Sequence, residues 1–385
     1  MPGFSNRKRE VTVADVAREA GVGKATASRV LGGYGSASER ARNQVLAAAA
    51  ELGYRPNEVA RSMNTGRSKT IGLVVGDIEN GYFGLAARGV SDALKGSGYG
   101  VVLANTSERV DAEIEAVKVL LDKRVDGLIV SPASAFVTQH LQDVYNSGRP
   151  LVLLDRRLDA LPVPSVRVNI SPAAFRATAA LLDAGHTRIA FLSSLMSDGP
   201  GYSGLELSVS SVTDRLSGIV RALKSRGMLP DPHLIRYRAE GAVRTKSIIR
   251  ELLALDSPPT ALIASDSKIA LDILLALREF GVAVPDAISL IAFDNFDWSP
   301  LINPSLTVVA QPTYEVGRLA AEVLLRVLQG EDQANEVPPL TAELIVRDSI
   351  GPAPIAQVQP AQVPSQVVGW SADDGHVELP VTLQP

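Results

Sequence analysis

The chain has 385 residues, a hydrophobic content of 46% and a net charge of −4, and it contains no cysteine. This length favours two or three domains with sizeable cores, and the absence of cysteine excludes disulfides and thiolate metal sites. No apolar run reaches the ~18 residues of a membrane span, and the charged start MPGFSNRKRE lacks the apolar core of a secretory signal, so we expect a cytoplasmic protein that does not engage a membrane.

The charge is divided unevenly along the chain. Residues 1–70 contain 12 Lys and Arg against 6 Asp and Glu, which leaves 26 against 36 for residues 71–385. A basic head on an acidic body indicates a polyanionic partner for the head alone. The arm at residues 1–10 carries the basic run RKR, and we expect it to be disordered, either idle or adding contacts to phosphate.

Residues 11–55 have the pattern of three short helices. Thr12 and Asp15 form the [ST]-x-x-[DE] capping box, which satisfies free backbone donors at the start of a helix over VADVAREA. Apolar residues of this stretch recur on one helical face, and Gly21 breaks the helix.

A second helix over KATASRVL follows after a short turn, and a third over ERARNQVLAAAAEL begins behind Ser38 as N-cap and ends at Gly53. Two short helices joined by a turn with glycine are the outline of a helix-turn-helix, whose second helix lies in the major groove of DNA. The side chains that this second helix leaves outward are Lys24, Ala25, Ser28 and Arg29. Arginine pairs bidentately with guanine, and lysine donates to guanine or to phosphate, although a small helical domain also carries basic side chains simply as a solvated face.

The stretches VTVADVAREAGVGKATASRVLGG and ERARNQVLAAAAELGYRPNEVARSMNTGRSKTIGLVV closely resemble the lactose-repressor-like (LacI/GalR) family of bacterial transcriptional regulators, and the similarity continues to about Ser349. The resemblance implies that bases are read by Lys24, Ala25 and Arg29. It implies contacts to the DNA backbone for Thr12, Thr26, Ser28, Ser38, Arg42 and Asn57. The chain departs from the family pattern at Gly23, Ala27 and Gly32, and the two glycines offer phosphate only a backbone N–H.

Residues 56–70 look like a linker but contain an apolar edge. The resemblance identifies Asn57–Met63 as a hinge helix, too short to be stable alone, that forms when two copies pack in the minor groove through Val59 and Ala60. Met63 would insert between base pairs as an apolar wedge that bends the duplex, and Arg61 would contact phosphate or the minor groove. The remainder, from Gly66 to residue 70, is then the flexible tether.

From residue 71 the pattern changes to short β-branched runs that alternate with amphipathic helices, which predicts parallel sheets covered on both faces. The expected strands form two sets and lie at 71–78, 100–106, 127–133, 150–155, 165–169, 188–194, 234–238, 260–266, 289–295 and 306–311. Two such sets predict two Rossmann-like lobes at residues 71–350, with a ligand cleft between the carboxyl ends of their strands and closure about a hinge. The predicted chain is thus an α/β protein: an all-α helix-turn-helix domain and hinge helix, then a two-lobed effector domain like a periplasmic binding protein.

Polar and aromatic residues past the strand ends are the expected effector contacts. They are Asn80, Tyr82, Phe83, Arg156, Arg215, Ser265, Asp266, Asp294 and Trp298. Carboxylates and guanidinium groups grip vicinal hydroxyls and rings stack on sugars or bases, so we expect a sugar, a sugar derivative or a nucleoside. The family resemblance supports Asp294 and Arg215 as ligand contacts, and it implies an altered hydrogen-bond pattern at Ser265, where asparagine is common.

Some of these positions have a second interpretation. Asp266 is either a ligand contact or only a helix N-cap, and Trp298 is either a stacking platform or a lid over the chain crossings. One of Tyr82 and Phe83 is expected in the core. The loop at 194–214, just before Arg215, either shapes specificity or is a passive insertion. The C-terminal extension at 351–385, rich in Pro, Gln and Val, is expected to be largely disordered.

Three function classes are compatible with parts of this sequence. The four histidines are not spaced as metal ligands, and no G-x-S-x-G, P-loop or G-x-G-x-x-G motif is present, so we expect neither an enzyme nor a metal or cofactor. A solute-binding protein would leave the basic head unexplained. A transcriptional repressor, homodimeric or tetrameric on a pseudo-palindromic operator and controlled by the effector, uses every feature; an activator or a co-repressor-dependent regulator of the same family is the alternative.

Overall fold

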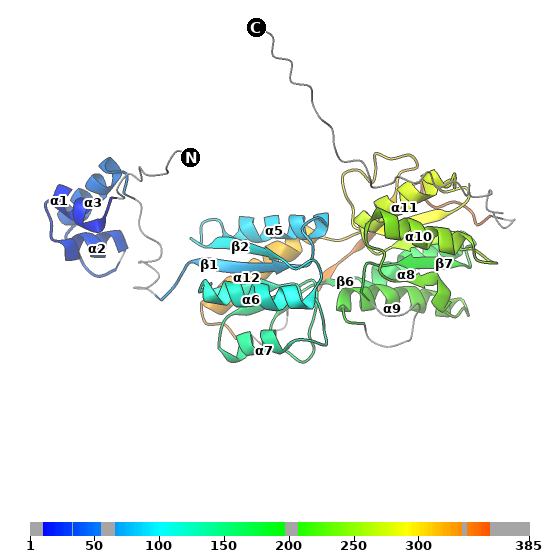
Figure 1. The fold of residues 1–385 in the computed structure, drawn as a ribbon, viewed down its shortest axis with the longest axis horizontal. Helices are drawn as coiled ribbons and strands as arrows, with labels where there is room; N and C mark the ends of the chain where they lie inside the picture. The colour runs from blue at the N-terminus through cyan, green and yellow to red at the C-terminus, as the bar shows by residue number, and fades with distance from the viewer. Residues whose placement is uncertain (1–10, 33, 55–65, 197–206, 333–336, 355–385) are drawn as a thin grey trace, which may run out of the picture.

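The computed structural model describes residues 11–32, 34–54, 66–196, 207–332 and 337–354 (Figure 1). The predictions for the arm at 1–10 and for the chain from 355 to 385 lie outside these residues, as do those for the hinge residues Asn57, Val59, Ala60, Arg61 and Met63. Figure 1 shows a three-helix head and a body of two α/β lobes. Within the described residues, no helix has the length and apolar character to span a bilayer.

The head consists of the three predicted helices, α1 (Val13–Glu19), α2 (Lys24–Gly32) and α3 (Glu39–Glu51). The capping box is present, because the Thr12 backbone N–H donates to Asp15 Oδ2 at 3.0 Å and the Asp15 N–H donates to Thr12 Oγ1 at 3.4 Å. All three helices turn small apolar side chains inward, and the buried core of the head is Val16, Ala17, Ala20, Ala27, Val30, Val45, Ala48 and Ala49. Because this core is small, the helix caps and turns contribute a large share of the stability of the head.

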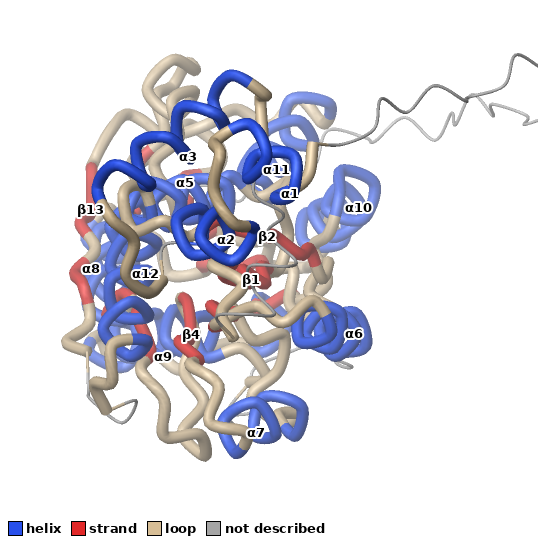
Figure 2. Tube along the Cα trace, turned by 90° about the vertical axis from the view of Figure 1, so that its left-hand side faces the viewer, coloured by secondary structure: helices blue, strands red, loops and turns tan. Residues whose placement is uncertain are grey.

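The lobe nearer the head in sequence, which we call the N-lobe, is built on a parallel sheet of order β2-β1-β3-β4-β5. Its strands are β1 (Thr70–Val75), β2 (Gly100–Asn105), β3 (Gly127–Val130), β4 (Leu151–Leu154) and β5 (Ser165–Val166). One face packs against α5 (Gly81–Leu94) and α12 (Thr313–Leu328), and the other against α6 (Val110–Asp122) and α7 (Gln139–Asn146). Figure 2 shows these helices around the strands.

The second lobe, the C-lobe, has the sheet order β13-β11-β10-β9-β7-β8, parallel except for β13. Its strands are β7 (Ile189–Leu192), β8 (Ile235–Arg236), β9 (Ala261–Ala264), β10 (Ser289–Phe293), β11 (Thr307–Ala310) and β13 (Glu343–Ile345). The two faces are covered by α8 (Ser171–Asp183) with α9 (Ser210–Ser225) and by α10 (Gly241–Leu253) with α11 (Ser267–Glu279). The two-lobed fold predicted from the alternating pattern is confirmed.

The chain crosses between the lobes more than once. The strand predicted at 165–169 is in fact two: β5 joins the N-lobe sheet, while β6 (Val168–Asn169) pairs with β12 (Leu340–Thr341) in a small separate ribbon. The alternating pattern continues through both pieces, so the change of sheet has no local signal. Another crossing lies between β11 and α12, which returns the chain to the N-lobe.

The helix that carries Arg215 begins earlier than predicted. The sequence places Arg215 at the start of a helix after a loop ending at residue 214, whereas α9 begins at Ser210. Three buried residues recur here at helical spacing: Val209, Val212 and Leu216. Their packing against the lobe stabilises helical structure in the serine-containing turn before Arg215, so the helix starts earlier than predicted. Residues 197–206 of this loop lie outside the described part of the chain.

Two glycines allow α5 and α12 to touch backbone to backbone. A Cβ built on Gly89 would lie 2.1 Å from the carbonyl oxygen of Tyr314, and one on Gly317 would lie 1.9 Å from that of Ala86. Any larger residue at either position would force the helices apart. These contacts lock a helix from near the end of the chain onto the first helix of the N-lobe.

His186 contacts the chain at Gly351 and holds it against the C-lobe. Its ring is fully buried between α8 and β7, with Nδ1 2.9 Å from Thr260 Oγ1 and Nε2 3.0 Å from the Gly351 carbonyl oxygen. Burial lowers the pKa of this imidazole. These contacts tie the junction between α8 and β7 to Thr260 and Gly351.

Candidate nucleic-acid interface and ligand cleft

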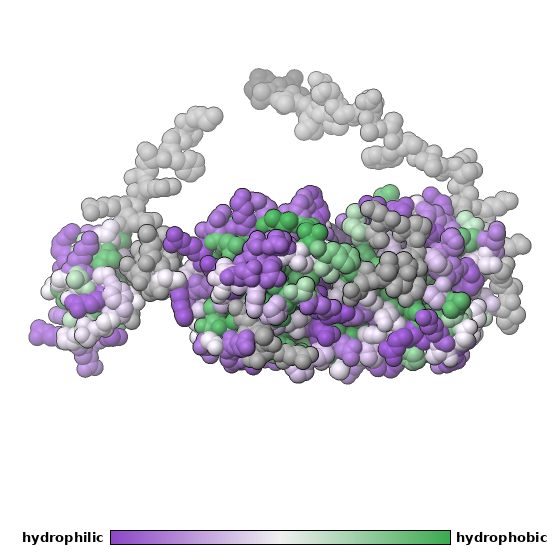
Figure 3. Space-filling view, turned by 90° about the horizontal axis from the view of Figure 1, so that it is seen from below, coloured by the Kyte–Doolittle hydropathy of each residue, from purple (hydrophilic) through white to green (hydrophobic). Residues whose placement is uncertain are grey.

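Helix α2 presents a polar outer face. Lys24, Ala25 and Arg29 are exposed, while Ala27 and Val30 of the same helix are buried in the head core. In Figure 3 the surface of the described head is mostly hydrophilic. The residues that the family resemblance assigns to base reading therefore share one accessible surface.

The Arg29 side chain is oriented by its neighbours. Its Nε donates to the Ala25 carbonyl oxygen at 3.2 Å, and a Cβ built on Gly35 would lie 3.2 Å from its Cδ. Gly35 has φ +70°, a conformation that L-residues rarely adopt. The turn after α2 thus leaves room for the arginine stem while the guanidinium stays on the surface.

The residues assigned to the DNA backbone lie around this face. Thr12 and Ser38 are N-caps of α1 and α3, with the Ser38 hydroxyl accepting from the Ala41 N–H at 3.3 Å. Thr26 is half-buried in α2, and Arg42 is exposed on α3. Their roles at DNA stay predictions, as do those of the hinge residues from Asn57 to Met63.

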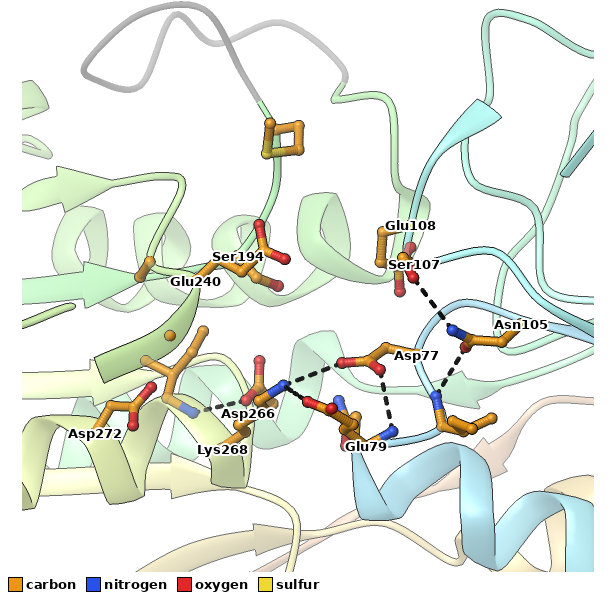
Figure 4. Close-up of a pocket in the computed structure, with 16 residues that line it drawn as sticks. Asp77, Glu79, Asn105, Ser107, Glu108, Ser194, Glu240, Asp266, Lys268 and Asp272 are labelled. Carbon is orange, nitrogen blue, oxygen red and sulfur yellow. Dashed lines mark hydrogen bonds and ion pairs between the residues drawn. The ribbon is translucent and has the colours of Figure 1, made fainter. Parts of the chain in front are cut away.

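In the body, strand ends from both lobes surround three adjoining cavities. The outer cavity has a volume of about 320 Å³, a side cavity about 230 Å³ and an inner cavity about 60 Å³. All three share Glu108 of the N-lobe and Ser194 of the C-lobe, so they form one cleft between the lobes. Figure 4 shows the residues that line the outer cavity. The outer part has the size of a small-ligand site, whereas the inner part has room for only a few water-sized groups.

The N-lobe wall of the inner cavity contains the predicted aromatic pair. Tyr82 and Phe83 are both buried, at right angles with centroids 5.4 Å apart, and both line the cavity. The Tyr82 hydroxyl donates to Asp155 Oδ1 at 3.0 Å, and burial followed by the charge of Asp155 raises the pKa of this phenol well above its usual range. The expectation that one of the two rings belongs to the core holds for both, since both also pack in the main hydrophobic cluster. Asn80 caps α5 by accepting from the Tyr82 N–H at 3.0 Å.

Arg156 is fixed by Glu108, which the sequence did not single out. The guanidinium donates to both Glu108 carboxylate oxygens at 2.7 Å and to the Pro132 carbonyl oxygen at 2.7 Å. Although burial opposes the charge, Glu108 raises the pKa of Arg156. A Cβ on Gly76 would lie 2.1 Å from Glu108 Oε1, so a glycine after β1 makes space for this pair. No local pattern indicates this pair, because the two residues are 48 positions apart in the chain.

The C-lobe wall centres on Arg215 and Asp294, both of which are buried and line the inner cavity. The Arg215 guanidinium lies over the Phe293 ring, 4.9 Å from its centroid, and its Nε has no hydrogen-bond partner. Asp294 follows β10 with φ +75° and accepts from Gln311 Nε2 at 2.7 Å. Burial raises the pKa of Asp294 to about 7, against the lowering effect of Arg215. The buried Arg215 Nε is an unpartnered donor, and the Asp294 carboxyl has a pKa near neutral pH. Such a pair is suited to binding a polyhydroxylated ligand.

Asp266 is a helix cap and a cleft residue at once. Its Oδ1 accepts from the Ile269 N–H at 2.9 Å, which caps α11, and Ser265 Oγ donates to its Oδ2 at 3.2 Å. Burial raises the pKa of this carboxyl. The N-cap interpretation is confirmed, while contact with a ligand stays a prediction for this cavity-lining side chain, which Ser265 orients.

Trp298 stands apart from the other predicted contacts. It is half-buried against the C-lobe core and does not line any of the three cavities. In this arrangement of the lobes, the structure does not support the stacking role.

Ion pairs join the lobes across the cleft. Lys268 at the start of α11 donates to Glu79 Oε2 at 2.7 Å and to Asp77 Oδ2 at 3.3 Å, both in the N-lobe (Figure 4). On the other side, Arg157 Nη1 donates to Asp214 Oδ2 at 2.8 Å. These contacts favour the closed arrangement of the lobes.

Replacing Lys268 by methionine is expected to raise the dissociation constant of a cleft ligand about two- to fivefold, because exposed ion pairs contribute about 0.2–1 kcal/mol and a ligand must then supply more of the closure. Lys246→Met is the matched control, since Lys246 pairs with Glu279 within the C-lobe. Isothermal titration of both variants with the same ligand checks this. Equal dissociation constants for the two variants would contradict a closing role.

The outer cavity is strongly acidic. It is lined by six carboxylates and one ammonium group: Asp77, Glu79, Glu108, Glu240, Asp266, Asp272 and Lys268. Burial raises the pKa of Asp272, and the nearby charge of Asp266 adds a smaller effect in the same direction. Within the described residues, no three His, Cys, Asp or Glu side chains are placed to hold a metal ion. The cleft therefore repels anions and offers many acceptors to hydroxyl or ammonium donors.

Comparison with known proteins agrees with this two-part organisation. Residues 12–57 match the model of the bacterial regulatory proteins of the lacI family, and residues 178–350 match a periplasmic binding protein-like domain. Catabolite control protein A of Priestia megaterium is 30% identical over 342 residues, which cover 88% of this chain and 99% of the relative.

Two solved structures are similar along the same length. The lac repressor dimer bound to operator and the anti-inducer ONPF is 26% identical with a TM-score of 0.71, covering 89% of this chain and all of that one. A complex of the transcriptional regulator CelR with cellobiose is 28% identical with a TM-score of 0.63, covering 88% of this chain and all of the other. The helix-turn-helix head, the two-lobed body and the near full-length similarity together establish that the chain belongs to the LacI family of bacterial regulatory proteins.

Proposed function

We propose that this protein is a transcriptional repressor of the cytoplasm that binds a pseudo-palindromic operator as a homodimer and is controlled by a neutral, sugar-like effector in the cleft. The observation that carries the proposal is the union, in one chain, of an exposed basic recognition helix with a polar cleft between two lobes. The effector controls DNA binding only if it prefers one arrangement of the lobes.

The DNA-binding part of the proposal rests on α2. Lys24, Ala25 and Arg29 face solvent and would meet base edges, while hydroxyls at the helix starts would position the head on the backbone. The solved lac repressor relative is a dimer on its operator, which supports two heads on two half-sites here.

The dimer surface is proposed on the sides of α5 and α11, which both lie along the upper side of the body in Figure 1. Leu85 of α5 is 41% exposed, and Leu271 and Leu275, one turn apart on α11, are 44% and 50% exposed. Exposed apolar side chains that lie on the same side of both lobes in this way indicate a protein contact. A tetramer would need a further surface.

The effector class follows from the charge of the cleft. Six carboxylates against one ammonium group in the outer cavity disfavour a phosphorylated ligand, and they accept hydrogen bonds from sugar hydroxyls. The CelR relative holds cellobiose, which supports a neutral sugar for this chain.

A thermal-shift screen tests the effector. At a hundredfold excess over its Kd, a neutral sugar is expected to stabilise the native protein by about 2.7 kcal/mol, which raises Tm by several degrees. The corresponding sugar phosphates are expected to give no shift. Stabilisation by phosphorylated sugars alone would contradict the proposed ligand class.

Gel retardation with fragments of the source genome tests the DNA function separately. A repressor retards a small set of fragments and releases them when the stabilising sugar is added. A solute-binding protein retards none, whatever ligand it binds.

A further inference from the structure

Tyr34 folds back onto the recognition helix from the turn that follows it. Its backbone N–H donates to the Arg29 carbonyl oxygen at 3.1 Å, and its hydroxyl lies 2.8 Å from Ser28 Oγ. A Cβ built on Gly32 would lie 2.3 Å from Cε1 and 2.6 Å from Cδ1 of the Tyr34 ring. The ring therefore occupies the space that a side chain at position 32 would fill, and only glycine there leaves it free.

This contact places Tyr34 on one particular edge of α2. Lys24, Ser28 and Gly32 are four residues apart, so they follow one another along one side of the helix. Lys24 is exposed at the start of this edge, and Tyr34, which is 42% exposed, takes the place of a side chain at its end. The edge thus carries an ammonium group, a serine hydroxyl and a phenol hydroxyl in sequence.

We propose that Tyr34 contacts the DNA backbone, with its hydroxyl and that of Ser28 acting as one unit on a phosphate group. This rests on the proposed DNA-binding function of the head. In a pair of hydroxyls, one donates to the other and the remaining O–H is left to donate outward. A phosphate oxygen is a strong acceptor for that proton, and tyrosine and serine hydroxyls are common donors to phosphate. The tyrosine supplies from the turn what Gly32 cannot supply from the helix.

The chemistry separates this role from others. A phosphate contact carries no sequence information, so its loss weakens operator and unrelated DNA alike. A hydroxyl carries no charge and displaces no counterion, so the slope of affinity against salt stays unchanged.

Tyr34→Phe removes only the hydroxyl and keeps the ring over Gly32. Fluorescence anisotropy would measure its affinity for a duplex selected from a random pool by the native protein, and for a random duplex of equal length, across salt concentrations. We expect both affinities to fall about 150-fold or more for a dimer that loses one charged hydrogen bond in each half-site. In an ethylation-interference experiment, we expect the variant to lose the interference signal at one phosphate in each half-site.

Gly32→Ala provides a second, independent variant. Alanine favours helix more than glycine does, so α2 should become more stable, yet the new Cβ displaces the Tyr34 ring. We expect the same phosphate to disappear from the interference pattern although the melting temperature of the protein does not fall.

The possible results divide clearly. Unchanged affinity and an unchanged interference pattern for Tyr34→Phe would overturn the proposal, and so would a loss confined to the selected duplex, which would make Tyr34 a base reader or a determinant of α2 geometry. Native protein that retains no duplex at all would overturn the DNA-binding function itself. Equal losses on both duplexes with an unchanged salt slope support Tyr34 as a phosphate contact.

Discussion

Replacing Arg29 by lysine is expected to abolish the preference for operator over random DNA while leaving random-sequence binding nearly intact. The lysine keeps the positive charge, but it lacks the planar fork that pairs bidentately with guanine. Each such pair contributes about 1–3 kcal/mol of discrimination, so two half-sites lose about 30-fold to 20,000-fold in specificity. Arg29→Ala should lose the specificity and also some random-sequence binding.

Arg18→Ala is the matched control for charge. Arg18 lies on α1, is 76% exposed in its side chain and pairs with Asp15 at 3.2 Å. The Arg18→Ala substitution removes one positive charge from the head without changing any residue of α2. Footprinting and competition with random duplex at fixed salt measure the specificity ratio. A lysine variant that protects the same operator with the native ratio would show that Arg29 does not read bases.

Replacing Asp294 by asparagine is expected to weaken effector binding strongly while it stabilises the fold above neutral pH. Asparagine keeps the shape, tolerates φ +75° and still has a carbonyl oxygen for Gln311. It cannot offer the two charged acceptor oxygens, and each lost charged hydrogen bond costs about 1.5–3 kcal/mol, which raises Kd about 10- to 150-fold. DNA binding without effector should persist.

The stability effect has a definite sign. Burial raises the pKa of Asp294 from 3.8 to about 7, so the folded state favours the protonated carboxyl. The contribution to stability is greatest below pH 3.8, falls as pH rises towards 7, and above 7 leaves a buried ionised group that costs at most about 4 kcal/mol. The asparagine variant avoids this cost, so its Tm should exceed that of the native protein at pH 8 and the difference should vanish in acid.

Effector affinity gives the complementary readout. In the native protein it should rise with pH through about 7, as Asp294 ionises and accepts hydrogen bonds from hydroxyls, and in the asparagine variant this dependence should be absent. Asp297→Asn, an exposed change in the following loop, is the control. Native-like dose curves for operator release by Asp294→Asn would remove this residue from the effector site.

The fold was largely predictable because its signals are local. β-Branched runs between helices gave both sheets, and Thr12 with Asp15 gave the start of the head through a hydrogen-bond pattern fixed by spacing. β13 was missed because Glu343–Ile345 is short and pairs antiparallel to a distant strand, β11. Its stability comes from a tertiary partner that no local pattern names.

The sequence predicted which residues line the cleft better than it predicted which of them contact one another. The end of a strand led to Asp294 and the family resemblance supported Arg215, and both line the inner cavity, while their roles at a ligand stay predictions. The sequence did not reveal that Glu108 occupies both nitrogens of Arg156, or that Lys268 joins the lobes, because each pair is far apart in the chain. Tyr34 was missed since its effect depends on the space left by Gly32.

The seating of α12 on α5 through Gly89 and Gly317 has a consequence for biosynthesis. All five strands of the N-lobe sheet have been synthesised once the ribosome has passed residue 166. However, α12, which covers the same sheet face as α5, ends only at Leu328. At about 5–20 residues per second, ribosomal synthesis of the intervening chain takes roughly 10–30 s. Throughout that interval the sheet face beside α5 is bare, so the lobe begun first is completed after most of the C-lobe has emerged. Nascent chains of this protein should therefore depend on chaperones, and a gene truncated before α12 should yield an aggregating fragment and no isolated N-lobe.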